Sequence, residues 1–144
     1  MTSLTSLTSH PSRARETRIA WSLVASYAAL IFILSSLPGS NPVLQGLGKY
    51  VWDKLLHLLE YLFLGILLAR ALALSFKYRS LEHLVFMAFV FGGLYALSDE
   101  WHQSFVPLRN ASLYDWTADS IGILIGAYLF GYKIIRVLKR EQNA

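Results

Sequence analysis

The 144-residue chain has no cysteine and few charged residues. Without cysteine it can form no disulfide, no thiolate metal site and no cysteine nucleophile. Charged residues make up only 15% of the sequence, whereas hydrophobic residues make up 55%. A soluble domain of this size would have too little polar surface to cover itself, so the composition indicates an integral membrane protein.

The formal net charge of +4 does not indicate a nucleic-acid partner. Positive residues gather at the ends of apolar segments, whereas a phosphate-binding surface would place them along one polar helix face. The observed distribution is typical of side chains that orient a protein in a membrane. No internal repeat or low-complexity tract is present, and the length predicts one domain.

Four apolar segments predict four transmembrane helices, at residues 19–37, 55–76, 84–97 and 116–132. The first is basic at its start like a signal peptide, but its uncharged run exceeds the usual core of about 7–15 residues and no A-x-A-like cleavage site follows. The third is too short to cross about 30 Å of hydrocarbon at about 1.5 Å per residue. Its helix must continue through polar residues, which draws Asp99 and His102 towards the membrane, until Pro107 ends it.

Flanking charges predict the orientation and the domain boundaries. With the N-terminus inside, only Lys49, Lys54 and Arg109 lie on the outer side, and the remaining segment-flanking cations are cytoplasmic. The predicted fold is therefore an all-α, four-helix transmembrane bundle with cytoplasmic N- and C-termini. A disordered basic tail is expected at residues 1–18, the membrane domain at 19–138 and a second cytoplasmic tail at 139–144.

Polar residues at helical spacing concentrate at the outer ends of three segments. Residues three and four apart share a helix face. The three polar faces hold Asp53, His57, Glu60 and Tyr61; Asp99, His102 and Gln103; and Asp115 and Asp119. A charged side chain near the membrane midplane costs about 3 kcal/mol when it faces lipid. The three faces are therefore expected to turn inward and meet.

Catalysis and metal binding are two kinds of chemistry that fit such a cluster. A histidine–carboxylate pair can act as acid and base, and imidazole with carboxylate can bind a divalent metal. The candidates for both roles are His57, Glu60, Asp99 and His102. No HExxH or comparable signature is present, so no cofactor is predicted and a divalent metal remains an open alternative.

Binding of a headgroup is the third kind of chemistry, and interhelical packing is the structural alternative. Arg109 can grip a phosphate or carboxylate with its planar guanidinium. The candidate ligand-binding residues are Asp53, Glu100, Gln103, Arg109 and Asp115. Buried ion pairs can also simply hold helices together. Asp115 and Asp119 are in addition favoured at a helix start by capping and the helix dipole, and Gly122 and Gly126 allow another helix to approach.

Three blocks of residues resemble the VanZ-like family of small bacterial membrane proteins. They are Asp53-Lys54-x-x-His57-x-x-Glu60-Tyr61, Asp99-Glu100-x-His102-Gln103-x-Phe105-Val106-Pro107-x-Arg109 and Asp115-x-x-x-Asp119-x-x-Gly122-x-x-x-Gly126. The chain departs from the family pattern at Asp119, where asparagine is usual, and at Leu108, where glycine is frequent. The family's namesake is associated with low-level resistance to the glycopeptide teicoplanin, which implies a setting in the bacterial cell envelope and not a reaction.

The combined expectation is a multi-pass protein of the bacterial cytoplasmic (inner) membrane. Its partners are the lipid bilayer and a lipid-linked or cell-wall headgroup, bound at the outer polar cluster. One alternative is a membrane-embedded hydrolase or transferase that acts on a lipid phosphate, with His102 or His57 as the acid–base group. The other is a structural or accessory membrane subunit in which the cluster only joins helices.

Overall fold

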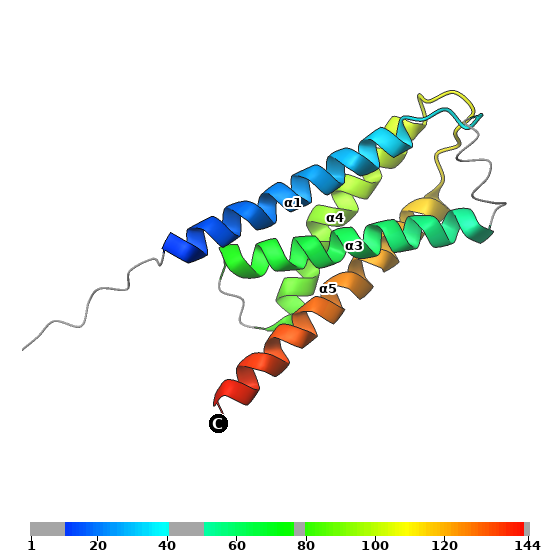
Figure 1. Cartoon of the computed structure of the whole chain (residues 1–144). Helices are drawn as coiled ribbons and strands as arrows, with labels where there is room; N and C mark the ends of the chain where they lie inside the picture. The colour runs from blue at the N-terminus through cyan, green and yellow to red at the C-terminus, as the bar shows by residue number, and fades with distance from the viewer. Residues whose placement is uncertain (1–10, 41–50, 77–79, 143–144) are drawn as a thin grey trace, which may run out of the picture.

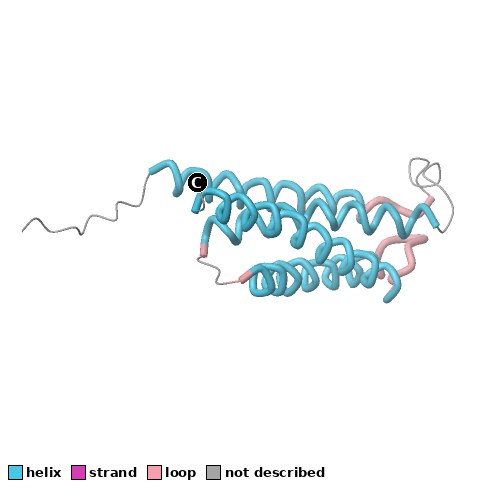
Figure 2. Tube along the Cα trace, turned by 90° about the horizontal axis from the view of Figure 1, so that it is seen from below, coloured by secondary structure: helices cyan, strands magenta, loops and turns pink. Residues whose placement is uncertain are grey.

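The structure is a computed structural model that describes residues 11–40, 51–76 and 80–142. Within these ranges the protein is entirely helical and contains no strand, as predicted. The helices are α1 (Pro11–Ser35), α3 (Val51–Ser75), α4 (Leu81–Gln103) and α5 (Leu113–Gln142). Helices α1 and α3 run alongside each other, α4 and α5 cross α3 obliquely, and α3 lies between α1 and α5 (Figure 1). Figure 2 shows the four helices packed in one bundle, seen from below.

The helix boundaries differ most from the apolar segments at three ends. Helix α1 begins at Pro11, so residues 11–18 of the expected disordered tail are helical, and residues 1–10 lie outside the described part. Proline suits a first helical position because the amide that it lacks would have no partner there. Helix α4 continues through its polar end as predicted, but it stops at Gln103, before Pro107. Helix α5 reaches Gln142 and includes most of the expected C-terminal tail.

Hydrogen bonds between distant segments identify the two ends of the bundle. The Trp21 indole donates to the Ser75 hydroxyl at 2.8 Å, which joins the start of α1 to the end of α3. At the opposite end, the Gly39 amide donates to the Pro107 carbonyl at 3.1 Å. This second bond joins the segment after α1 to the connection between α4 and α5. We call this end, formed by residues 36–40 and 104–112, the loop end.

Three helices are long and apolar enough to cross a membrane. They correspond to Arg13–Ser35, Lys54–Ser75 and Leu81–Gln103, and the described part of α5 is not among them. The helices also carry large apolar side chains on the outside of the bundle, of which Ile33, Phe63, Phe86 and Leu94 are between 57% and 62% exposed. An apolar exterior of this kind suits lipid rather than water.

Glycines bring α3 and α5 into direct backbone contact. A Cβ atom added to Gly122 would lie 2.3 Å from the Leu58 carbonyl oxygen, and one added to Gly126 would lie 2.1 Å from the Leu62 carbonyl oxygen. Gly65 on α3 approaches Ile123 on α5 in the same way, at 2.4 Å from its carbonyl oxygen. The predicted close approach along Gly122 and Gly126 is therefore confirmed, and α3 is the helix that uses it.

Candidate functional site

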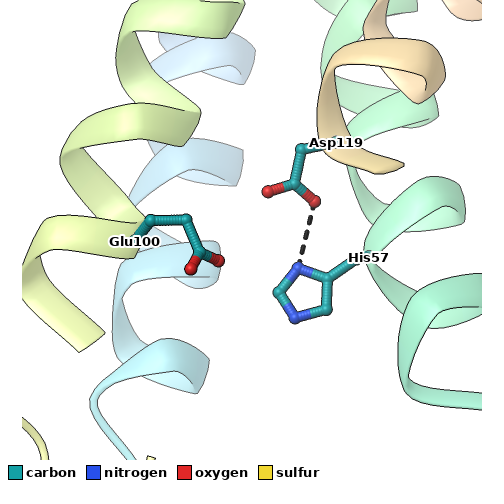
Figure 3. A group of neighbouring side chains, drawn as sticks. All are labelled: His57, Glu100 and Asp119. Carbon is teal, nitrogen blue, oxygen red and sulfur yellow. Dashed lines mark hydrogen bonds and ion pairs between the residues drawn. The ribbon is translucent and has the colours of Figure 1, made fainter. Parts of the chain in front are cut away.

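Three helices bring one imidazole and two carboxylates together near the loop end. His57 on α3 lies 3.0 Å from Asp119 on α5, measured from Nδ1 to Oδ1. Glu100 on α4 points its carboxylate towards this pair (Figure 3). One ligand atom from each of the three residues lies within 4.8 Å of the other two. We call His57, Glu100 and Asp119 the triad.

The triad is buried, and two of its oxygen atoms have no hydrogen-bond partner. His57, Glu100 and Asp119 are 9%, 6% and 0% exposed. Glu100 Oε2 accepts a hydrogen bond from the Ser112 amide at 2.7 Å, whereas Glu100 Oε1 and Asp119 Oδ2 are buried without a partner. A buried polar atom without a partner costs about 1–3 kcal/mol, so these oxygens need an explanation beyond helix packing.

Close packing of α3 and α5 holds His57 against Asp119. Gly122 lies three residues after Asp119, and its missing side chain leaves room for the Leu58 carbonyl, which follows His57 directly in the chain. Tyr61 lies one turn after His57 on the same face, is fully buried and has an unpartnered hydroxyl. The geometry of the His57–Asp119 pair thus depends on the contact between Gly122 and the Leu58 carbonyl.

Asp99 belongs to a second network, which joins α1 to α4. The Ser35 hydroxyl donates to Asp99 Oδ1 at 2.5 Å, and the Gln103 side-chain amide donates to Asp99 Oδ2 at 3.0 Å. All three side chains are buried. Both oxygens of Asp99 therefore have partners, in contrast to Glu100 and Asp119.

His102 faces α1 at the edge of the bundle. Its Nε2 lies 3.0 Å from the Ser36 hydroxyl, and its ring stacks on Phe32 with the ring centroids 4.4 Å apart. His102 therefore packs against the last turn of α1, through Phe32, and against the residue that follows α1, Ser36. The structure groups His57 with Glu100 and Asp119, and it groups His102 with Ser36 and Phe32.

Two cations among the described residues near this end of the bundle, Arg109 and Lys54, contact other segments of the chain. Arg109 donates from Nε to the Leu37 carbonyl at 3.2 Å and from Nη2 to the Leu34 carbonyl at 3.1 Å. Its guanidinium therefore satisfies carbonyl groups at the end of α1, which helix termini leave without intrahelical partners. Lys54 on α3 forms an ion pair with Asp115 on α5.

Two further candidates are Glu60 and Asp53, and no described hydrogen bond joins the Glu60 carboxylate to the triad. The carbonyl of Glu60 accepts a hydrogen bond from the Tyr27 hydroxyl at 3.1 Å, so its main chain helps to seat α1 on α3. The side chain of Asp53 lies outside the described residues.

Asp119 was not among the candidate site residues, because its position near a helix start already explains a carboxylate there. The signal that could have identified it is its register with Gly122 and Gly126 on one stripe of α5.

Comparison with known proteins places the chain in a family. The model of the VanZ/LLP1 family matches residues 4–136. The chain belongs to the VanZ/LLP1 family. The resemblance carried by the three residue blocks is thereby confirmed, and with three span-length helices the chain is a membrane protein of that family. None of the curated proteins and none of the solved structures compared with the chain matches it.

The turn after α4 has a backbone conformation that favours glycine, although leucine stands there in this chain. Leu108 has a φ of 61°, in the left-handed region that glycine adopts at lower cost than other residues. Its carbonyl oxygen would lie 1.9 Å from a Cβ on Gly39. The loop end of this VanZ/LLP1 protein is therefore held by a tight backbone crossing in which Gly39 leaves the room that Leu108 needs.

A groove of about 500 Å³ opens beside the triad of this VanZ/LLP1 protein. It lies between α4 and α5, and most of its wall is apolar. Its lining residues are Leu97, Glu100, Trp101, Ser104, Ala111, Ser112, Leu113 and Trp116. Because Glu100 also belongs to the triad, the groove and the buried polar cluster share one carboxylate.

Proposed function

We propose that this VanZ/LLP1 protein is a multi-pass protein of the bacterial cytoplasmic membrane that binds the headgroup of a lipid-linked or cell-wall molecule at its loop end. In this proposal all four helices cross the membrane, both termini are cytoplasmic and the loop end faces outward. The antiparallel packing of α1 on α3 and the basic residues flanking the other end support that orientation.

The orientation predicts which introduced cysteines react from outside the cell. The native chain has no cysteine, so a single cysteine gives an unambiguous signal. Asn110→Cys, at the exposed loop end, is expected to react with a membrane-impermeant maleimide in intact cells, because it faces outward. Glu82→Cys, at the exposed start of α4, is expected to react only after the cells are opened. The reverse pattern would contradict the orientation.

The observation that carries the headgroup proposal is that Glu100 belongs both to the buried triad and to the wall of the apolar groove. Its Oε2 faces the Ser112 amide in the groove wall, and its Oε1 is buried without a partner. A ligand with an apolar chain and a polar head matches a site of this kind, since apolar walls provide burial and a few polar groups fix orientation. Trp101, Leu113 and Trp116 provide the apolar walls.

The charges near the groove limit the chemistry of the headgroup. Asp99, Glu100 and Asp119 are buried acids, whereas the Arg109 guanidinium bonds to carbonyl groups of α1. A bare phosphate against Glu100 would meet like charge. The group that contacts Glu100 is therefore a hydrogen-bond donor, an amine, or a phosphate whose charge a cation offsets.

Filling the groove is expected to abolish lipid binding without unfolding the protein. Ala111→Trp places a large side chain at an exposed position of the lining. The control is Ile33→Trp, which introduces the same side chain at an exposed residue of α1, a helix that does not line this groove. Native mass spectrometry with a polyprenyl phosphate and with phosphatidylethanolamine should detect a bound lipid on the wild type and the control, but not on Ala111→Trp. Equal binding by all three proteins would contradict the proposal.

The His57–Asp119 pair favours one second candidate, a hydrolase or transferase that acts on a lipid phosphate. A hydrogen bond from one imidazole nitrogen to a carboxylate fixes the tautomer of the ring, and a histidine held in this way can move a proton. This candidate predicts release of phosphate from a polyprenyl diphosphate by the wild type, and its loss in His57→Gln. Binding without turnover would leave the headgroup-binding proposal ahead.

A further inference from the structure

We infer that His57, Glu100 and Asp119 form a binding site for one divalent transition-metal ion, such as Zn²⁺ or Mn²⁺. The inference concerns the triad alone and does not rest on lipid binding. It starts from the convergence of three ligand atoms, from three different helices, within 4.8 Å of one another. The 3.0 Å between His57 Nδ1 and Asp119 Oδ1 is close to the separation of two adjacent ligands on a metal with bonds of about 2.0–2.2 Å.

The unpartnered oxygens give independent support for a bound cation. Glu100 Oε1 and Asp119 Oδ2 are buried and accept no hydrogen bond from the described residues, whereas Glu100 Oε2 accepts one from the Ser112 amide and Asp119 Oδ1 lies 3.0 Å from His57 Nδ1. Residues that only joined helices would satisfy both oxygens, as Asp99 does with Ser35 and Gln103. Each carboxylate therefore keeps coordinating capacity that the described protein groups leave unused.

The negative charge of the two carboxylates also supports a bound cation. When both carboxylates are ionised and the imidazole is neutral, the triad carries two negative charges, and burying such charge without a counter-ion is costly. Lys54 pairs with Asp115, at the turn of α5 before Asp119. A divalent ion would offset the charge of the triad, and such an ion commonly binds where buried acids converge.

The ligand set indicates the class of metal. One imidazole nitrogen with carboxylate oxygens suits Zn²⁺, Mn²⁺, Fe²⁺ or Co²⁺, whereas Mg²⁺ and Ca²⁺ prefer oxygen ligands alone. Three protein ligands leave at least one coordination position for water or for an oxygen of a bound molecule. Glu100 is the triad residue that also lines the groove, so a metal held by the triad would lie beside the groove.

The test is a titration of full-length protein, purified in detergent without a polyhistidine tag and stripped with EDTA. Isothermal titration with Zn²⁺ is expected to give one site per chain on the wild type. Glu100→Gln and Asp119→Asn keep side-chain size and remove a ligand charge. Each is expected to weaken binding by at least about tenfold, since even outer-shell changes have effects of that order. His83→Ala is the matched control, because it removes an exposed imidazole at the start of α4.

The outcomes separate this inference from the headgroup proposal. Wild-type binding at one equivalent with loss in both triad variants supports the metal site. Absence of stoichiometric Zn²⁺ and Mn²⁺ binding by the wild type, or equal affinity in Glu100→Gln, overturns it. Lipid binding that persists in EDTA would leave the headgroup proposal intact while the metal site fails. If one triad variant elutes as an aggregate in size-exclusion chromatography, the other decides.

Discussion

Replacing Gly122 with alanine is expected to push α3 away from α5 at the level of the triad and to destabilise the protein. The added Cβ would lie 2.3 Å from the Leu58 carbonyl oxygen and 2.9 Å from the Leu62 amide nitrogen. Both are backbone atoms, so no side chain can rotate to make room. Overpacking of this kind typically costs about 1–3 kcal/mol. Thermal unfolding of the variant in detergent should show a clearly lower midpoint than the wild type.

The same substitution should weaken cation binding, because Gly122 supports the triad. Leu58 follows His57 directly, and Asp119 precedes Gly122 by one turn, so separation of the helices lengthens the His57–Asp119 contact. Gly93→Ala is the matched control: it changes a buried glycine, yet the new Cβ would approach only the Phe89 ring, at 3.7 Å. If Gly122→Ala and Gly93→Ala had the same midpoint and the same affinity for Zn²⁺, the proposed packing of α3 on α5 would be wrong.

Replacing Asp99 with alanine is expected to loosen α1 while leaving the triad intact. The change removes one acceptor of the Ser35 hydroxyl and the acceptor of the Gln103 amide, and both side chains are only 4% exposed. The Ser35 hydroxyl keeps the Phe32 carbonyl as an acceptor, at 3.1 Å, whereas the Gln103 amide loses its acceptor. A buried donor without a partner costs about 1–3 kcal/mol, with membrane-embedded hydrogen bonds towards the lower value. The midpoint of thermal unfolding should fall, and a cysteine in α1 should become more reactive.

Two further variants decide whether Asp99 acts as a link between helices. Asp99→Asn keeps one acceptor oxygen, so its midpoint should lie between those of the wild type and Asp99→Ala. Ser98→Ala, at the exposed neighbouring position, should match the wild type. Affinity for Zn²⁺ should be unchanged in Asp99→Ala. A loss of Zn²⁺ binding that exceeds the loss in Glu100→Gln would instead make Asp99 a ligand and contradict the division into two networks.

The arrangement of the helices was largely predictable because hydropathy and residue spacing report on it directly. The four apolar runs predicted α1, α3, α4 and α5, and the short third run correctly required a helix that continues past Asp99. Gly122 and Gly126 predicted a close helix contact, since two glycines four residues apart on one helix face let the backbone of another helix approach. Boundaries were less accurate where charged residues extend a helix beyond its apolar run, as in α1 and α5.

The grouping of the polar side chains could not be predicted from spacing alone. Spacing shows which residues share a face of one helix, but the rotation and offset between helices decide which faces meet. His57 and His102 were therefore equivalent candidates in the sequence, yet one faces Asp119 and the other faces Ser36. Ser35 and Ser112 carried no signal, because a serine at a helix end is common. Arg109 suggested anion binding, whereas its described hydrogen bonds go to carbonyl groups of α1.

Binding of a cation would distinguish the triad from polar residues that merely join helices. The most direct measurement is thermal unfolding of EDTA-treated wild type and Glu100→Gln, each with and without Zn²⁺. A ligand at about 100 times its dissociation constant stabilises the folded state by about 2.7 kcal/mol, provided that it binds only that state. We expect Zn²⁺ to raise the midpoint of the wild type and to leave that of Glu100→Gln unchanged. Equal shifts in both proteins, or none in the wild type, would contradict a metal site at the triad.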